Sequence, residues 1–81
     1  MNSTDIREEL SLLNWEFIMK EAKETGDCWI PLSRNFRQAL TESDNWPAFD
    51  NIFGKRCKKR GGRFKYDGGG ESIRFILCAE N

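Results

Sequence analysis

Hydrophobic residues recur at helical spacing through the N-terminal third of the chain. Ile6, Leu10, Leu13 and Phe17 are separated by four, three and four positions, which is the spacing of one face of an α-helix. Asp5 and Glu8, three residues apart, give a helix start signal of the capping-box kind, and Gly26 gives a C-terminal stop signal. The pattern therefore predicts one helix over residues 4–25, with this apolar face in the core.

Two shorter elements are predicted next. Residues 28–32 (CWIPL) favour a strand, but Pro31 cannot donate a hydrogen bond to a neighbouring strand, so we expect a short edge strand. Ser33 is a typical N-cap residue, and the apolar spacing after it predicts a second helix that ends near residue 40 or 41. Arg34 and Arg37 lie three residues apart and are expected to share the exposed face of that helix.

A third helix is predicted from about residue 44 or 45 to Arg60. Pro47 is tolerated in the first turn of a helix. Gly54 weakens a helix by about 1 kcal/mol relative to alanine, but we expect the helix to continue through it. Glycines at positions 61 and 62 would end it. The residues expected to form its buried stripe are Phe49, Ile52, Phe53 and Cys57.

The C-terminal third of the chain alternates between apolar and polar residues. Phe64 and Tyr66 alternate with cations before the glycine-rich segment 67–70 (DGGG), and the alternation resumes from Ser72 to Cys78. This pattern predicts a β-hairpin whose tip is the glycine segment. The glycine spacing matches neither of the common phosphate-binding loops, and no predicted helix follows it.

The charges are divided unequally between the two parts of the chain. Its formal net charge is zero, but residues 1–51 carry a net charge of −5 and residues 52–81 a net charge of +5. Seven cationic side chains and no acidic one occur between positions 54 and 65. Because crowded like charges repel one another, we interpret this run as the binding site for a polyanion, most simply nucleic acid. The alternative is a solvated surface that only keeps the protein soluble.

The composition argues against several other classes of protein. Three widely spaced cysteines predict reduced thiols rather than a disulfide framework, and the absence of histidine and of any Cys-x-x-Cys pair excludes the common zinc motifs. The neighbouring cations are expected to lower the pKa of Cys57. Without histidine, a Ser-His or Cys-His nucleophile cannot form. Carboxylate-only chemistry remains open, but no paired acids stand in an apolar setting that would tune their pKa values. We therefore predict that the protein is not an enzyme, and we expect no cofactor. No apolar run is long enough to span a bilayer.

The order helix, short strand, helix, helix, strand, wing, strand resembles the winged-helix variant of the helix-turn-helix fold. The resemblance covers the whole chain as one α+β domain, residues 1–81, and depends on element order and charge placement. Residues 33–40 would be the second helix, residues 46–60 the third, and residues 63–78 the wing. In that family the third helix commonly enters the major groove of DNA, and the wing contacts the backbone or the minor groove.

The resemblance implies a set of DNA-binding residues in this chain. The third helix would use its late cations and Asn51, the wing strands would add three cations, and the second helix would support them. These residues are Arg34, Arg37, Asn51, Lys55, Arg56, Lys58, Lys59, Arg60, Arg63, Lys65 and Arg74. Cations in the last turns of a helix predict phosphate contacts rather than base reading, so we expect affinity with little sequence choice. The implied role is that of a transcription or replication accessory factor.

A second likeness keeps RNA open as the ligand. Residues 26–33 (GDCWIPLS) resemble the start of LOTUS (OST-HTH) domains, a winged-helix-like family associated with RNA and RNA helicases. Binding of unpaired RNA would require exposed rings at Trp46, Phe64 or Tyr66. We expect Phe64 and Tyr66 to lie partly in the core, so duplex DNA is the favoured ligand.

A protein partner is the remaining alternative. The acidic N-terminal helix could bind another protein, or it could form a homodimer if Trp15 or Met19 is exposed. The N-terminus lacks the basic and apolar layout of a signal peptide, which predicts an intracellular location, in the cytoplasm or nucleoid. In a eukaryote the run Lys55–Arg60 would also match a permissive nuclear import pattern.

Overall fold

The computed structural model describes residues 2–67 and 72–78 of the chain. Within these ranges the protein is a mixed α+β structure with four helices and a three-stranded antiparallel sheet. Its elements in chain order are α1 (Ser3–Leu10), α2 (Trp15–Thr25), β1 (Asp27–Ile30), α3 (Arg34–Glu42), α4 (Trp46–Lys59), β2 (Gly62–Asp67) and β3 (Ser72–Leu77).

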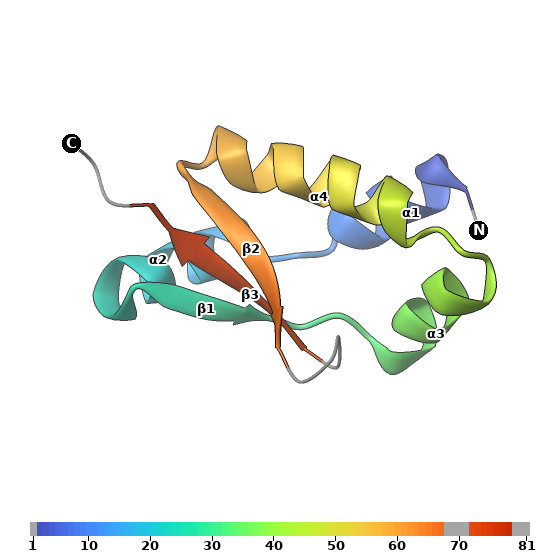
Figure 1. Ribbon diagram of the computed structural model, residues 1–81. Helices are drawn as coiled ribbons and strands as arrows, with labels where there is room; N and C mark the ends of the chain where they lie inside the picture. Colours follow the sequence, from blue (N-terminus) through green and yellow to red (C-terminus); the bar gives the residue numbers. More distant parts are fainter. Residues whose placement is uncertain (1, 68–71, 79–81) are drawn as a thin grey trace.

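The sheet has the strand order β1-β3-β2, so the last strand lies in the middle (Figure 1). Phe75 of β3 is the partner of Cys28 on β1 and of Phe64 on β2, and all three side chains point to the same face. The predicted hairpin is therefore confirmed for both of its strands. Its predicted tip falls on residues 67–70, of which 68–70 lie outside the described part of the chain.

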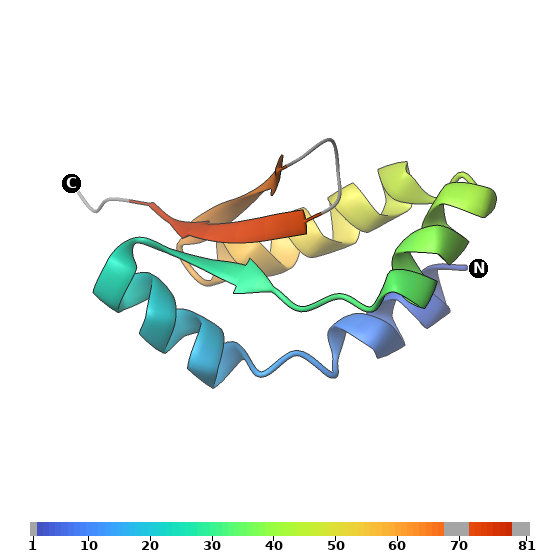
Figure 2. The same cartoon turned by 90° about the horizontal axis from the view of Figure 1, so that it is seen from below.

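Helices α2 and α4 pack on one face of the sheet, and α1 and α3 pack against α4. Trp15 of α2 contacts the Phe75 ring edge-on, with ring centroids 5.6 Å apart, and the Phe53 ring of α4 lies 5.0 Å from that of Phe64. Seen from below, α1 and α2 lie along one side of the molecule and the hairpin lies along the other (Figure 2). The outer face of the sheet, which carries Trp29, is not covered by any of the four helices in the described part of the chain.

The core lies between these helices and the inner face of the sheet. Phe49, Phe53 and Phe75 are fully buried there together with Ile6 and Leu10 of α1. The stripe predicted for the third helix, including Cys57, is confirmed as buried. The core is small because the described residues form a body of only 38 × 24 × 20 Å.

The prediction of one continuous helix over residues 4–25 is wrong. The helix ends at Leu10, and a new one begins at Trp15, because the Asn14 side chain caps it by accepting a hydrogen bond from the Phe17 amide at 3.1 Å. The break changes which residues of the second segment face inward. Ile18 is buried, whereas Phe17, predicted to be in the core, is 56% exposed.

The compactness of the core explains this break. A straight helix of 22 residues would be about 33 Å long, so it would fit only along the 38 Å dimension of the molecule and not across the other two. Splitting the segment allows α1 to pack against α4 while α2 packs against the sheet. Figure 2 shows the two helices as separate elements joined by a short link. Both halves therefore bury apolar residues in the same core.

The other elements agree with the sequence-based predictions within a few residues. The edge strand β1 ends immediately before Pro31, and the Ser33 side chain caps α3 by accepting a hydrogen bond from the Phe36 amide at 3.1 Å. Helix α4 continues through Gly54 to Lys59, and Gly61 follows with a left-handed φ of 77°. Within the described ranges, no helix has both the length and the apolar content needed to cross a membrane.

Two glycines offer a direct test of this packing. A Cβ atom at Gly62 would overlap the Phe75 ring and lie 2.6 Å from the Ile76 carbonyl oxygen, whereas one at Gly54 would lie 3.6 Å from its nearest neighbour, the Phe64 ring. We expect Gly62→Ala to lower the free energy of unfolding by about 1–3 kcal/mol. Gly54→Ala should raise it by about 0.5–1 kcal/mol, because alanine favours a helix. Urea unfolding of both variants checks this, and a stable Gly62→Ala protein would contradict the packing.

Candidate nucleic-acid interface

An open groove lies between α1 and the C-terminal half of α4. Its volume is about 540 Å³, and five of the seven residues that line it are cationic. The lining residues are Arg7, Asn51, Ile52, Lys55, Arg56, Lys58 and Lys59. The groove thus brings together five of the eleven residues predicted to bind nucleic acid, and it adds Arg7.

The helical period of α4 produces this arrangement. Asn51, Lys55 and Lys58 follow one another at i, i+4 and i+7, so they share a face that is turned away from the buried stripe. Helix α1 supplies the other side. Because Ile6 is fully buried, α1 is held against the core and the neighbouring Arg7 is placed at the groove.

Sequence reasoning missed Arg7. It is a single cation among the acidic residues Asp5, Glu8 and Glu9. No signal in the chain connects position 7 with position 55. Only the packing of α1 against α4 brings the two together.

Among the described residues, the lining of the groove contains no compensating negative charge. None of its lining residues is acidic, and in the described part of the chain none of its cations forms an ion pair. Arg56, Lys58 and Lys59 belong to the last turn of α4, and Arg7 to the last turn of α1. The negative end of each helix dipole favours cations there by about 0.3–1 kcal/mol each, which offsets part of their repulsion. The remaining positive potential is available to an anion.

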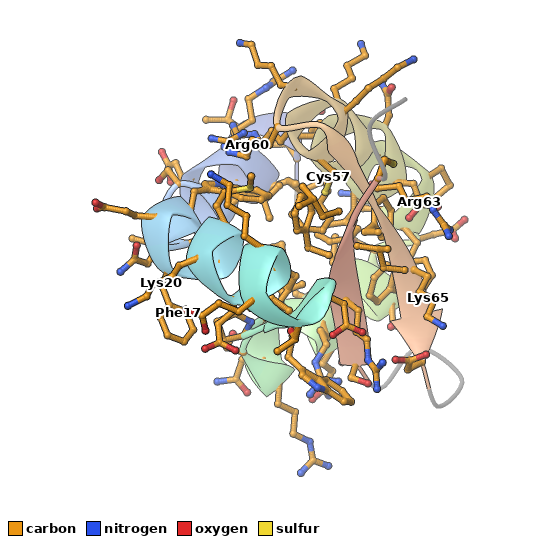
Figure 3. The ribbon with its side chains drawn as sticks, turned by 90° about the vertical axis from the view of Figure 1, so that its left-hand side faces the viewer. Phe17, Lys20, Cys57, Arg60, Arg63 and Lys65 are labelled. Atoms are coloured by element: carbon orange, nitrogen blue, oxygen red, sulfur yellow. The ribbon has the colours of Figure 1, made fainter. Side chains whose placement is uncertain are left out.

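Arg60 is placed differently from the cations before it. Its guanidinium carbon lies 4.0 Å from the centroid of the Trp15 ring, and Nη1 donates a hydrogen bond to the Arg56 carbonyl oxygen at 2.9 Å. Burial, reinforced by Arg56, lowers the pKa of Arg60. Figure 3 shows Arg60 next to α2, on the side of the molecule opposite Arg63 and Lys65. Arg60 therefore stabilises the packing of α2 on α4 and does not line the groove.

The predicted wing cations lie on the outer face of the sheet. Arg63 and Lys65 are exposed there, on β2 (Figure 3). Arg74 has partners within the protein, because Nη1 lies 3.0 Å from an Asp27 carboxylate oxygen and Nε lies 2.7 Å from one of Asp67. None of these three cations lines the groove.

The cations predicted on the second helix are also separate from the groove. Arg34 of α3 is exposed and Arg37 is half-buried, so the expectation of a shared exposed face holds for Arg34. Neither contributes to the lining between α1 and α4.

The expectation of a low pKa for Cys57 is wrong. Its side chain is fully buried, and burial raises the pKa of the thiol to about 12, whereas the opposing effect of Arg60 is smaller. Burial also raises the pKa of Cys28. Cys78 is exposed. In the residues that the structure describes, no cluster of three or more possible metal ligands occurs.

The rings considered for stacking on RNA bases are engaged within the fold. Trp46 is half-buried, and its indole nitrogen donates to the Thr41 hydroxyl at 3.0 Å. Phe64 is half-buried, as expected, and Tyr66 is 37% exposed. The Tyr66 hydroxyl donates a hydrogen bond to the Asp50 carboxylate. Burial, together with this hydrogen bond, raises the pKa of Tyr66.

The groove and the outer sheet face are thus two separate positively charged surfaces. The groove uses residues from α1 and α4, and the sheet face uses residues from β2 and β3. The function of these two surfaces is inferred below from the residues of this chain alone. No protein-family model matches the sequence, and no significant match was found among curated proteins or solved structures.

Proposed function

We propose that this protein binds nucleic acid, with double-stranded DNA as the preferred ligand, through the groove between α1 and α4. The observation that carries the proposal is the convergence of five cations from two helices on one groove that has no acidic lining. Among the described residues, none of these cations forms an ion pair. Lysine and arginine side chains in such a position contact the phosphates of a backbone without reading bases. The proposed role is a sequence-tolerant accessory factor in transcription or replication.

The position of Asp50 is compatible with this proposal. Its carboxylate precedes Asn51 in α4 and would repel a phosphate if it entered the groove. Asp50 instead accepts a hydrogen bond from the Tyr66 hydroxyl of β2. This bond holds the negative charge on the hairpin side of α4, away from the groove cations.

The arrangement of elements supports a winged-helix fold as part of the same proposal. Helix α3, helix α4 and the β2–β3 hairpin follow one another along the chain, and β1 closes the sheet beside β3. On this interpretation, α4 is the recognition helix and β2–β3 is the wing. The cations of α4 belong to its second half, which favours contact with the DNA backbone over insertion of the helix into the bases.

A second candidate function is protein binding through the other side of α1. Three carboxylates, those of Asp5, Glu8 and Glu9, line a separate groove of about 490 Å³ with Leu12 and Phe36. Leu12 is 76% exposed, and charge complementarity favours a basic, partly apolar peptide. The predicted dimer surface at Trp15 is not favoured, because that ring packs on Phe53, Phe75 and Arg60.

Titration of a labelled 20-base-pair duplex of random sequence at several salt concentrations tests the DNA proposal. Five phosphate contacts should give a log–log salt slope of about −4 to −5 and micromolar affinity at low salt. Unlabelled single-stranded DNA and RNA serve as competitors. Stronger competition by RNA than by the unlabelled duplex would contradict the preference for duplex DNA. Absence of binding to all three at low salt would overturn the proposal and favour the protein-binding alternative.

A further inference from the structure

The outer face of the sheet carries an exposed tryptophan in register with two cations. Trp29 on β1 is the partner of Arg74 on β3, which in turn is the partner of Lys65 on β2. The three side chains therefore form one row across the sheet. Trp29 is 55% exposed, and Figure 1 shows that no helix covers this face. Burial in the core does not explain a large aromatic side chain at this position.

Arg74 holds the tryptophan side of this row in a defined geometry. Its guanidinium carbon lies 4.6 Å from the centroid of the Trp29 ring. The same guanidinium is fixed by Asp27 at 3.0 Å and by Asp67 at 2.7 Å. One face of the indole is thus supported by a cation that cannot easily move. A ring held in this way loses little freedom when a second flat group stacks on it.

The charge of this face favours an anionic ligand. Arg74 partly neutralises the carboxylates of Asp27 and Asp67. Lys65 adds a second cation near Asp67, with its Nζ atom 3.8 Å from a carboxylate oxygen. Arg63, which lies two residues before Lys65 on β2 and on the same face, is exposed as well. Among the described residues of this face, three cations stand against two acids, which leaves a net positive charge next to the aromatic ring.

The size of the face favours a nucleotide segment over a protein. Three strands at about 4.8 Å spacing make a surface about 10 Å wide, and six residues extend for about 20 Å. The resulting projected area of about 200 Å² is enough for one or two nucleotides, whereas it would form only part of a typical protein interface. One or two unpaired nucleotides need only a ring for the base and a cation for the phosphate.

We propose that the outer sheet face binds single-stranded nucleic acid, with Trp29 as the stacking platform for one unpaired base. Lys65 and Arg63 would contact the adjacent phosphates. Stacking on an aromatic ring is tolerant of sequence, because every base has a π-face. This site shares no residue with the groove between α1 and α4, so a substitution of Trp29 leaves the cations of the groove in place. A protein having both sites could bind a duplex and an unpaired strand at the same time.

The experiment measures binding of labelled dT12 and of the 20-base-pair duplex at low salt by the wild type and three variants. We expect Trp29→Ala to weaken dT12 binding by about 5- to 100-fold and to leave duplex binding unchanged. Trp29→Phe should retain most of the dT12 affinity. Phe17→Ala is the matched control, because Phe17 is a similarly exposed ring outside this face (Figure 3) and its loss should change neither affinity.

Two further measurements separate the outcomes. Arg63→Gln with Lys65→Gln should reduce the dT12 salt slope by about 1.4, which corresponds to two phosphate contacts on a single strand. Failure of the wild type to bind dT12, or equal dT12 affinity of Trp29→Ala and the wild type, would overturn this proposal without affecting the duplex result. Equal loss of both ligands in folded Trp29→Ala, with folding checked by circular dichroism, would also overturn it. If the wild type retains a protein partner in a pull-down and Trp29→Ala does not, while the dT12 affinity of the two is the same, the face would be assigned to protein binding instead.

Discussion

Replacement of Lys55, Lys58 and Lys59 by glutamate is expected to abolish duplex binding. The three side chains supply most of the positive charge that α4 contributes to the groove, and within the described residues none of them is paired with an acid. Charge reversal removes three phosphate contacts and adds three repulsive groups, so we expect a loss of about 100-fold or more at low salt. With glutamine instead of glutamate, the salt slope should fall by about 3 in magnitude.

The chain offers a closely matched control for this experiment. Lys20 and Lys23 of α2 are exposed and lie three residues apart, as do Lys55 and Lys58 of α4. The two double glutamine variants change the net charge equally, but only the variant in α4 should lose duplex affinity. Glutamine also avoids placing new acids at the negative end of the α4 dipole, so the helix should remain intact. Equal loss in both variants would mean that net charge alone decides binding, and the groove would lose its assigned role.

Replacement of Phe49 by alanine is expected to have the largest effect on stability. The Phe49 ring is fully buried, and its centroid lies 5.3–6.1 Å from the ring centroids of four other aromatic residues. These neighbours are Phe36, Trp46, Phe53 and Phe64. A buried phenylalanine replaced by alanine costs about 3–5 kcal/mol. A chain of 81 residues has a total stability of only about 4–12 kcal/mol, so the variant should be largely unfolded or melt at a much lower temperature.

Phe17→Ala provides the comparison for this prediction. It removes the same side chain from another helix, but Phe17 is 56% exposed and its loss should cost less than about 0.5 kcal/mol. Thermal unfolding followed by circular dichroism measures both variants. A small change in melting temperature for Phe49→Ala would show that the aromatic cluster is not the centre of the core.

Local sequence signals were sufficient to predict most of the secondary structure. The Ser33 cap, the stripe from Phe49 to Cys57 and the alternation around Phe64 and Phe75 each depend on residues a few positions apart. The break before α2 was not predicted, because the apolar helical pattern continues across Asn14. The cap that the Asn14 side chain forms competes with this pattern. The packing of α1 and α2 on one small core decided that competition, and it exposed Phe17.

The candidate site was predicted only in part for the same physical reason. The cations of α4 are neighbours along one helix, so their common face follows from the helical period. Arg7 and Trp29 acquire their positions from long-range contacts, of α1 with α4 and of β1 with β3, which no local pattern encodes. The winged-helix resemblance implied DNA-binding roles for Arg60 and Arg74, but the fold placed aromatic rings and carboxylates beside them. The sequence by itself thus determined the type of each element and where most of them lie in the chain. The tertiary structure alone decided which cations remain unpaired, because pairing depends on which distant residues are brought into contact.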